Sequence, residues 1–304
     1  MALDTKETVL RARKNGVVIP AFNIPHLPML KAVVEAIRDE DSVAMIEVAR
    51  VEWEKFSAQS LEAVAEEYRK YADEKRTMLH LDHVPVIDED YKKVDYMPII
   101  ERAVKAGFGS VMVDASRLSF EENAAATKQV ADRAHAAGIP CEAELGAVMG
   151  HESGEMMPYE EIFATKTGFT KLDEAKRFAE ESGCDWLSVA VGNIHGAIAD
   201  ATRDQKKPTA RLDVEHIAAL HEAAGIPLVL HGGSGIDPEY IRAGIKAGIA
   251  KINVGTEVRQ VYEAALKESG NDIEAGRKAV YDAVRALLHD TLRISGTRSL
   301  LYGE

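Results

Sequence analysis

The chain has 304 residues and a formal net charge of −13, from 37 basic and 50 acidic side chains. It has no run rich in Lys and Arg, and an acidic surface repels nucleic acids and anionic membranes, so neither is expected as a partner. The two cysteines, Cys141 and Cys184, are too few for a disulfide framework or a Cys-rich zinc cluster, which favours a reduced, cytoplasmic setting. Residues 1–16 are polar and charged, and no apolar run reaches the length of a membrane span, so neither a signal peptide nor a transmembrane helix is expected.

Short apolar runs rich in β-branched residues recur along the chain and are typical of buried parallel strands. In chain order they occupy residues 17–23, 42–49, 77–83, 110–116, 139–146, 186–196, 226–233 and 249–256. Amphipathic helical patterns separate them, and several end in Gly just before the next strand, as a helix C-cap does. Eight strand–helix units favour an α/β fold of the closed (β/α)₈ barrel type over an open sheet.

The chain is expected to form one domain over residues 1–304, because no linker rich in Gly, Ser or Pro divides it. Residues from Glu257 to about Leu292 predict one or two extra C-terminal helices. Two long insertions follow the fifth and sixth strands, at about 147–170 and 197–212. Long loops at the carboxyl ends of barrel strands are often active-site lids.

Histidines and carboxylates stand at the carboxyl ends of the predicted strands, where a barrel keeps its chemistry. From the third strand to the eighth they are Asp82, His83, Asp114, Glu144, His195, His231 and Asn253. A lone His at a strand end is more often a hydrogen-bonded structural residue than a ligand. Three on one rim, two of them followed by Gly, favour a shared metal ion, and imidazole with carboxylate suits Zn²⁺ or another divalent cation.

Two glycine-containing segments predict a phosphate site. The segment from His231 to Gly235 reads His-Gly-Gly-Ser-Gly, and Asn253 to Thr256 reads Asn-Val-Gly-Thr. Backbone N–H groups and a hydroxyl in such segments can cradle an anion, although many Gly-rich stretches are only tight turns. Their place after the seventh and eighth strands matches the usual phosphate site of a barrel.

Glu152 is flanked by Gly150 and Gly154 in the loop after the fifth strand. An acidic residue in a mobile loop can act as a base when the loop closes. The alternative is a solvated loop glutamate, which is the commoner case.

These motifs together resemble the class II, metal-dependent ketose-bisphosphate aldolases, the family of fructose- and tagatose-bisphosphate aldolases. The resemblance covers nearly the whole chain and keeps the order of the motifs. They are AFN at 21–23, HLDH at 80–83, GSVMVDAS at 109–116, EAELG at 142–146, VGNIHG at 191–196, LVLHGGSG at 228–235 and KINVGTE at 251–257.

The resemblance implies a role for each matching residue. His83, His195 and His231 would be the zinc ligands, with Glu144 and Asp114 holding the metal in an alternative position or supporting its ligands. Asp82 would carry the proton of the aldehyde oxygen, Glu152 would take the proton from the ketose-phosphate carbon, and Asn253 would steady the enediolate. The implied substrate and phosphate contacts are Asn23, Gly196, Gly232, Gly233, Ser234, Asn253, Gly255 and Thr256. The family also implies a monovalent cation, Na⁺ or K⁺, near the phosphate, and a homodimer or homotetramer.

The sequence departs from the family after the second strand. Bisphosphate-cleaving members usually carry Gln-x-Ser and glycines there, whereas Arg50 stands about where that Ser belongs, and bulkier residues replace the glycines. Arg50 is either a clamp for the aldehyde end of the substrate or part of a salt bridge to Glu47 or Glu52. Fructose 1,6-bisphosphate is the default substrate by family frequency. Tagatose 1,6-bisphosphate or a sugar-acid derivative is the alternative.

Two other functions fit the same rim less well. A barrel metallohydrolase usually carries a His-x-His pair after the first strand, which this chain lacks. A non-catalytic metal or sugar-phosphate binding protein would not need the complete set of acid, base and metal-ligand residues. Arg293 and Arg298 either reach a phosphate, in their own chain or in a neighbouring subunit, or place charge at a helix end.

Overall fold

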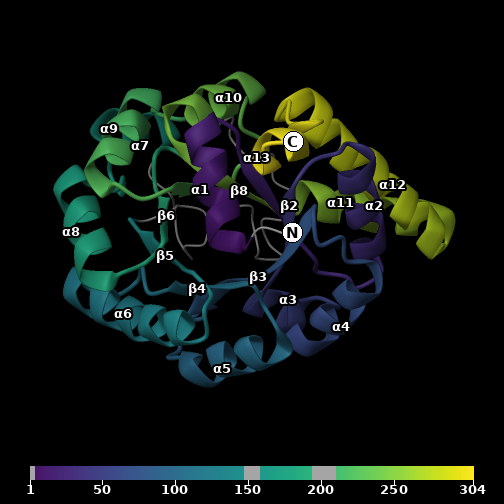
Figure 1. Cartoon of the computed structure of the whole chain (residues 1–304), viewed down its shortest axis with the longest axis horizontal. Coiled ribbons are helices and arrows are strands. Elements are labelled where there is room, and N and C mark those ends of the chain that lie inside the picture. Colours follow the sequence, from purple (N-terminus) through teal and green to yellow (C-terminus); the bar gives the residue numbers. More distant parts are fainter. Residues whose placement is uncertain (1–3, 147–157, 194–209) are drawn as a thin grey trace.

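The computed structural model describes residues 4–146, 158–193 and 210–304. Eight parallel strands form a closed barrel in chain order, and β8 completes the ring by pairing with β1 (Figure 1). The strands are β1 (Ile19–Asn23), β2 (Ala44–Ala49), β3 (Thr77–Pro85), β4 (Ser110–Asp114), β5 (Cys141–Leu145), β6 (Trp186–Val189), β7 (Leu228–Leu230) and β8 (Ile249–Val254). Seven lie within their predicted ranges and β3 runs two residues further, so the predicted (β/α)₈ barrel is confirmed.

An outer layer of helices surrounds the barrel (Figure 1). Between strands it consists of α2 (Met29–Asp39), α4 (Leu61–Tyr71), α5 (Tyr96–Ala106), α6 (Phe120–Ala136), α8 (Leu172–Ser182), α9 (Val214–Ala224) and α10 (Pro238–Ala247). Two of the predicted glycine caps, Gly107 after α5 and Gly183 after α8, adopt positive φ angles of 81° and 69°. No helix in these described segments is both long and apolar enough to cross a membrane.

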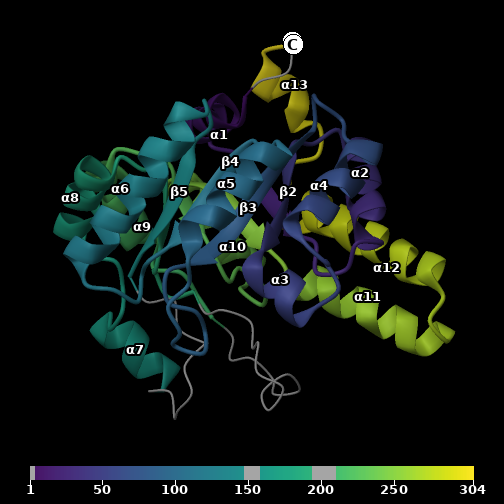
Figure 2. The same ribbon diagram turned by 90° about the horizontal axis from the view of Figure 1, so that it is seen from below.

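The amino end of the barrel is apolar and covered. Helix α1 (Thr5–Asn15) and α13 (Thr297–Tyr302) lie together at one end of the molecule, while α3 (Arg50–Lys55) and α7 (Tyr159–Thr165) lie towards the other (Figure 2). Val9 of α1 and Leu301 of α13 belong to one buried cluster with Ile19 and Trp186 at the beginnings of strands. This packing closes the amino end of the barrel.

The C-terminal region contains more helix than the sequence predicts. The expected pair is present as α11 (Thr256–Ser269) and α12 (Ile273–Ala286), which pack against each other and extend away from the barrel (Figure 2). A short π-helical segment at Leu287–Thr291 and then α13 follow. Arg298 of α13 donates to Asp41 at 2.8 Å and to Glu304 at 2.6 Å, near the beginnings of the strands. The suggestion that Arg298 reaches a phosphate in the site of its own chain is therefore wrong.

Two short helices stand at the carboxyl end. Helix α3 begins directly after β2, where the sequence gives no helical period, and α7 lies in the second half of the insertion predicted at about 147–170. Residues 147–157 of that insertion and residues 197–209 of the other lie outside the described residues.

Candidate active site

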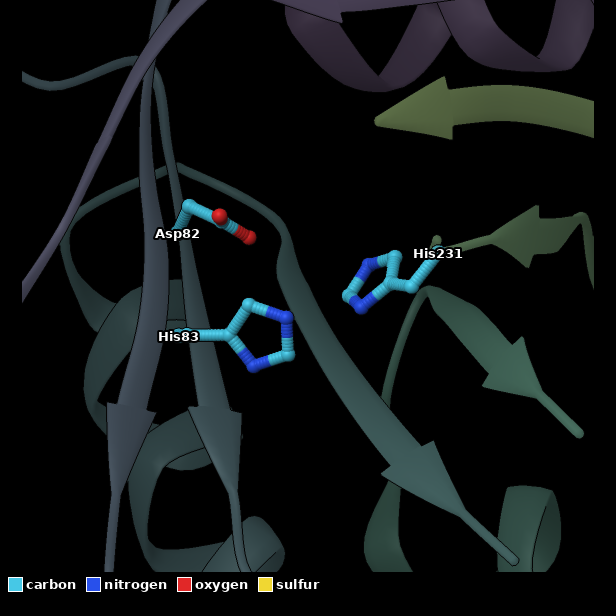
Figure 3. Close-up of side chains that lie close together, drawn as sticks. All are labelled: Asp82, His83 and His231. Atoms are coloured by element: carbon cyan, nitrogen blue, oxygen red, sulfur yellow. The ribbon is translucent and has the colours of Figure 1, made fainter. Parts of the chain in front are cut away.

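Asp82 and His83 are consecutive residues of β3, yet both point toward His231 at the mouth of the barrel (Figure 3). Successive side chains of a regular strand face opposite sides of a sheet. Here the register between β3 and β4 shifts between Leu81 and Val84, and His83 has a φ of 26°. A bulge of this kind re-aims a side chain, and it explains how neighbouring residues can share one site.

His83 and His231 face each other across the mouth. Their ring centroids are 4.5 Å apart with an interplanar angle of 66°. Potential ligand atoms of Asp82, His83 and His231 lie within 4.8 Å of one another, and so do those of His83, Asp114 and Glu144. The two groups share His83, so the geometry offers two adjoining cation positions.

Carboxylates surround these imidazoles. His83 Nδ1 lies 3.3 Å from Asp114 Oδ2, and His231 Nδ1 lies 3.1 Å from Glu144 Oε2. Burial opposes protonation of His83, but the charges of Asp82, Glu144 and Asp114 outweigh it and hold the pKa of His83 well above its ordinary value. The site therefore stabilises positive charge, and nitrogen and oxygen donors in this setting fit a divalent cation.

The carboxylate of Asp82 is held by two amides. Asn23 Nδ2 donates to one of its oxygens and Asn253 Nδ2 donates to the other, each at 2.9 Å. Burial favours the neutral acid, but the nearby His83 and His231 outweigh it and keep the pKa of Asp82 below its ordinary value. Asp82 is thus an oriented, ionised carboxylate that is only 2% exposed.

Lys251, two residues before Asn253 on β8, fixes the orientation of the Asn253 side-chain amide. Its Nζ donates to Asn253 Oδ1 at 2.6 Å, which leaves the NH₂ group of Asn253 to face Asp82. The same ammonium group lies 3.0 Å from Glu142 Oε2, and Glu142 Oε1 lies 2.8 Å from His231 Nε2. A carboxylate on one ring nitrogen orients a histidine so that the other nitrogen faces the site.

The two predicted phosphate segments lie next to each other, since β7 pairs with β8. Gly255 and Thr256 stand at the beginning of the 14-residue helix α11, whose first N–H groups favour an anion. A Cβ at Gly255 would lie 2.9 Å from Asn23 Oδ1, and one at Gly233 would lie 2.8 Å from the side chain of Ile252. Both glycines are thus closely packed against neighbouring side chains, and Gly232 and Ser234 complete the segment after β7.

Arg50 is the first residue of α3 and its side chain is 17% exposed. It pairs with Glu54 at 2.8 Å and with Asp88, in the segment after β3, at 3.5 Å. These partners differ from the Glu47 or Glu52 expected from the sequence, because residue 50 opens a helix and its i,i+4 neighbour is Glu54. Both carboxylates already engage the guanidinium, so its role toward substrate stays a prediction.

Three predicted site residues, Glu152, His195 and Gly196, lie outside the described residues. Asp82, His83, Asp114, Glu144, His231, Asn23 and Asn253 are brought together by the geometry described above.

On the barrel strands, the buried Glu, His and Lys residues that escaped the sequence interpretation are Glu47, His80, Glu142 and Lys251. Three of them stand two positions before a predicted site residue: His80 before Asp82, Glu142 before Glu144, and Lys251 before Asn253. Alternate residues of a barrel strand point inward. A polar residue two positions before a predicted site residue is therefore expected to face the same interior, and this spacing could have identified these three. The ammonium group of Lys251, 3.4 Å from Glu47, supplies positive charge among these residues.

Comparisons with known proteins agree with the geometry. The solved structure of the YdjI aldolase from Escherichia coli K12 is 29% identical, with a TM-score of 0.76, and the match covers 98% of this chain and 100% of that one. A Coccidioides immitis protein assigned as a fructose-1,6-biphosphate aldolase is 28% identical, with a TM-score of 0.75 and coverage of 96% and 97%. The fructose-bisphosphate aldolase of Campylobacter jejuni, at 20% identity, a TM-score of 0.73 and coverage of 95% and 94%, shares the fold. Residues 3–298 match the family described as fructose-bisphosphate aldolase class-II, and the chain therefore belongs to this family of carbon–carbon lyases.

Proposed function

We propose that the protein is a divalent-metal-dependent aldolase that reversibly cleaves a ketose bisphosphate, or a related ketose 1-phosphate, to dihydroxyacetone phosphate and an aldehyde. The observation that carries the proposal is the convergence of an ionised, doubly hydrogen-bonded Asp82 with His83 and His231 at the carboxyl end of the barrel (Figure 3). Membership of the class II family supports the same reaction.

His83, His231 and His195 would hold the metal, with Asp114 and Glu144 as supporting or alternative ligands. Zn²⁺ suits this donor set. When bound, such a cation polarises the ketose carbonyl and stabilises the negative charge that develops as the carbon–carbon bond breaks.

Asp82 would manage the proton on the aldehyde side. In cleavage it accepts the proton of the C4 hydroxyl as the C3–C4 bond breaks and the C4 oxygen becomes an aldehyde; in condensation it returns that proton. Asn23 and Asn253 support this role because they hold both carboxylate oxygens in fixed directions. Glu152 would exchange the other proton, at C3 of the ketose phosphate.

The phosphate of the dihydroxyacetone phosphate half would bind to the segments after β7 and β8. Gly232, Gly233, Ser234, Gly255, Thr256 and Gly196 would surround it, with Na⁺ or K⁺ nearby. The beginning of α11 at Gly255 and Thr256 supports this placement, because the first backbone N–H groups of a helix favour an anion.

Fructose 1,6-bisphosphate is the default substrate, and tagatose 1,6-bisphosphate or a sugar-acid derivative is the alternative. The departures after β2, where α3 and Arg50 stand, bear on the aldehyde end. Homodimer or homotetramer formation and a cytoplasmic location complete the proposal. The buried free thiols of Cys141 and Cys184 support a reduced setting.

Solvent deuterium exchange into dihydroxyacetone phosphate tests the proposal without any aldehyde. Metal-loaded protein should exchange the C3 proton, and both a chelator and Glu152→Ala should abolish the exchange. No exchange by the metal-loaded protein would reduce the proposal to a metal-binding barrel.

A further inference from the structure

Glu52 places a second carboxyl group at the mouth of the barrel. It lies in the first turn of α3, and its Oε2 accepts a hydrogen bond from the Ala49 N–H at 2.8 Å. Ala49 is the last residue of β2 and stands opposite Asp82 in the β2–β3 register. The side chain therefore folds back from α3 to the level of Asp82.

Asn23 connects the two carboxyl groups. Its side chain donates to Asp82 Oδ2 at 2.9 Å and also lies near enough to Glu52 to lower the pKa of that carboxyl group. Glu52 is 6% exposed, between the values for Asp82 (2%) and Asn253 (8%). Its burial thus matches that of the residues proposed to meet substrate, rather than that of Glu54, the solvent-facing member of the same helix, whose side chain is 39% exposed.

The two carboxyl groups differ in charge. Burial, reinforced by the negative charge of Asp82, raises the pKa of Glu52 to about 8, although the Ala49 N–H and the nearby Asn23 side chain oppose the shift. At neutral pH Glu52 thus carries a proton and can donate a hydrogen bond, whereas Asp82 is an acceptor. Paired carboxyl groups whose environments push their pKa values apart are typical of active sites.

The position of Glu52 favours the aldehyde half of the substrate. Asn23 on β1 lies between β8, which carries the phosphate segment at Gly255, and β2, which leads into Glu52. Glu52 therefore lies on the far side of Asn23 from the phosphate segments and on the side of Asp82, which handles the aldehyde oxygen. A sugar-derived aldehyde presents hydroxyl groups there.

We propose that Glu52 contacts substrate and hydrogen-bonds a hydroxyl group of the aldehyde half, so that the enzyme prefers hydroxylated aldehydes. The proposal rests on the proposed aldolase function. A site built around a hydrogen bond discriminates against an analogue that lacks the hydroxyl, since a buried polar group is then left unpaired.

The test compares glyceraldehyde with propanal, which has the same carbon chain without hydroxyls, in condensation with dihydroxyacetone phosphate. The wild type should prefer glyceraldehyde. Glu52→Ala should lower kcat/KM for glyceraldehyde about tenfold or more and leave propanal almost unchanged, while Glu52→Gln, which can still donate, should keep part of the preference. Lys55→Ala, at the far end of α3, is the matched control and should keep the wild-type preference.

Deuterium exchange into dihydroxyacetone phosphate separates the possible failures. All variants should retain exchange, and thermal unfolding of Glu52→Gln should show that the fold is intact. An equal fall for both aldehydes would mean that Glu52 only positions Asn23 and Asp82, and it would overturn the proposal, as would an unchanged preference in Glu52→Ala. Absence of exchange in the wild type would instead overturn the aldolase function itself, and this proposal with it.

Discussion

Replacing Lys251 by Met should strongly destabilise the barrel, because this ammonium group holds the polar interior together. Lys251 is completely buried, and it lies 3.0 Å from Glu142 and 3.4 Å from Glu47. With an effective dielectric constant of about 20, the contact with Glu142 has a gross attraction of about 5 kcal/mol. Burial raises the pKa of Glu47 well above its ordinary value, so the contact with Glu47 is not counted as an ion pair. Desolvation of Lys251 and Glu142 offsets much of the attraction between them, so the intact pair adds little net stability.

Removal of one partner has a much larger effect than that net value. Met fills a similar volume, but the Glu142 carboxylate is left without its cation, and Asn253 loses its donor. Breaking a buried ion pair in this way typically costs about 3–5 kcal/mol. We expect Lys251→Met to lose stability in this range.

Urea unfolding of the metal-free protein, followed by circular dichroism, measures the change. Lys70→Met is the matched control, because Lys70 pairs with Glu67 at the exposed surface and its loss should leave stability almost unchanged. Lys251→Met combined with Glu142→Gln removes both charges and should be more stable than the sum of the single changes predicts. A Lys251→Met variant within about 1 kcal/mol of wild type, or strict additivity in the double variant, would refute the reasoning.

Four further outcomes are expected. Asp82→Asn should lower kcat/KM for aldol cleavage by about 10²–10⁴ while metal content, measured by mass spectrometry, is retained, because the proton carrier is lost while one of the two asparagine amides keeps its acceptor oxygen. Glu142→Gln should weaken metal binding about 10–100-fold in a competition titration with a chelator, because His231 loses its orienting carboxylate. His231→Ala should bind metal more weakly still, since a ligand itself is removed. Because burial raises the pKa of Glu52 from 4.5 to about 8, the folded state holds a proton that the unfolded state releases in this window. Stability should therefore fall with rising pH by at most about 1.4 kcal/mol per unit, and Glu52→Gln should lack this contribution in urea titrations at several pH values.

The barrel could be predicted from the sequence because apolar residues recur with different spacing in its strands and in its helices. All eight strands and the caps after α5 and α8 follow from local pattern, and the strand ends identify the rim on which Asp82, His83 and His231 meet. In a parallel barrel every carboxyl end lies on the same side, so a one-dimensional pattern is enough to place these side chains together.

Other features depend on contacts between distant segments, and the sequence does not reveal them. The bulge at His83 depends on the register between β3 and β4, and nothing within β3 alone predicts it. Arg50 meets Asp88 only because α3 packs beside the segment after β3. Helix α3 has no side-chain cap, because its N-cap residue is Ala49. Instead, the Glu52 carboxyl group in its first turn accepts a hydrogen bond from the Ala49 N–H.

The interior of the barrel divides into two halves with different physical roles. Around the strand beginnings, Ile19, Met45 and Trp186 form a dry apolar layer closed by α1 and α13, and here burial of apolar surface stabilises the fold. Around the strand ends, carboxylates outnumber ammonium groups. The negative charge of these carboxylates raises the pKa of His83. A divalent cation bound by these residues would relieve this imbalance. The polar half is thus suited to bind a metal and to act on a substrate because the apolar half and the outer helices supply the stability that it lacks.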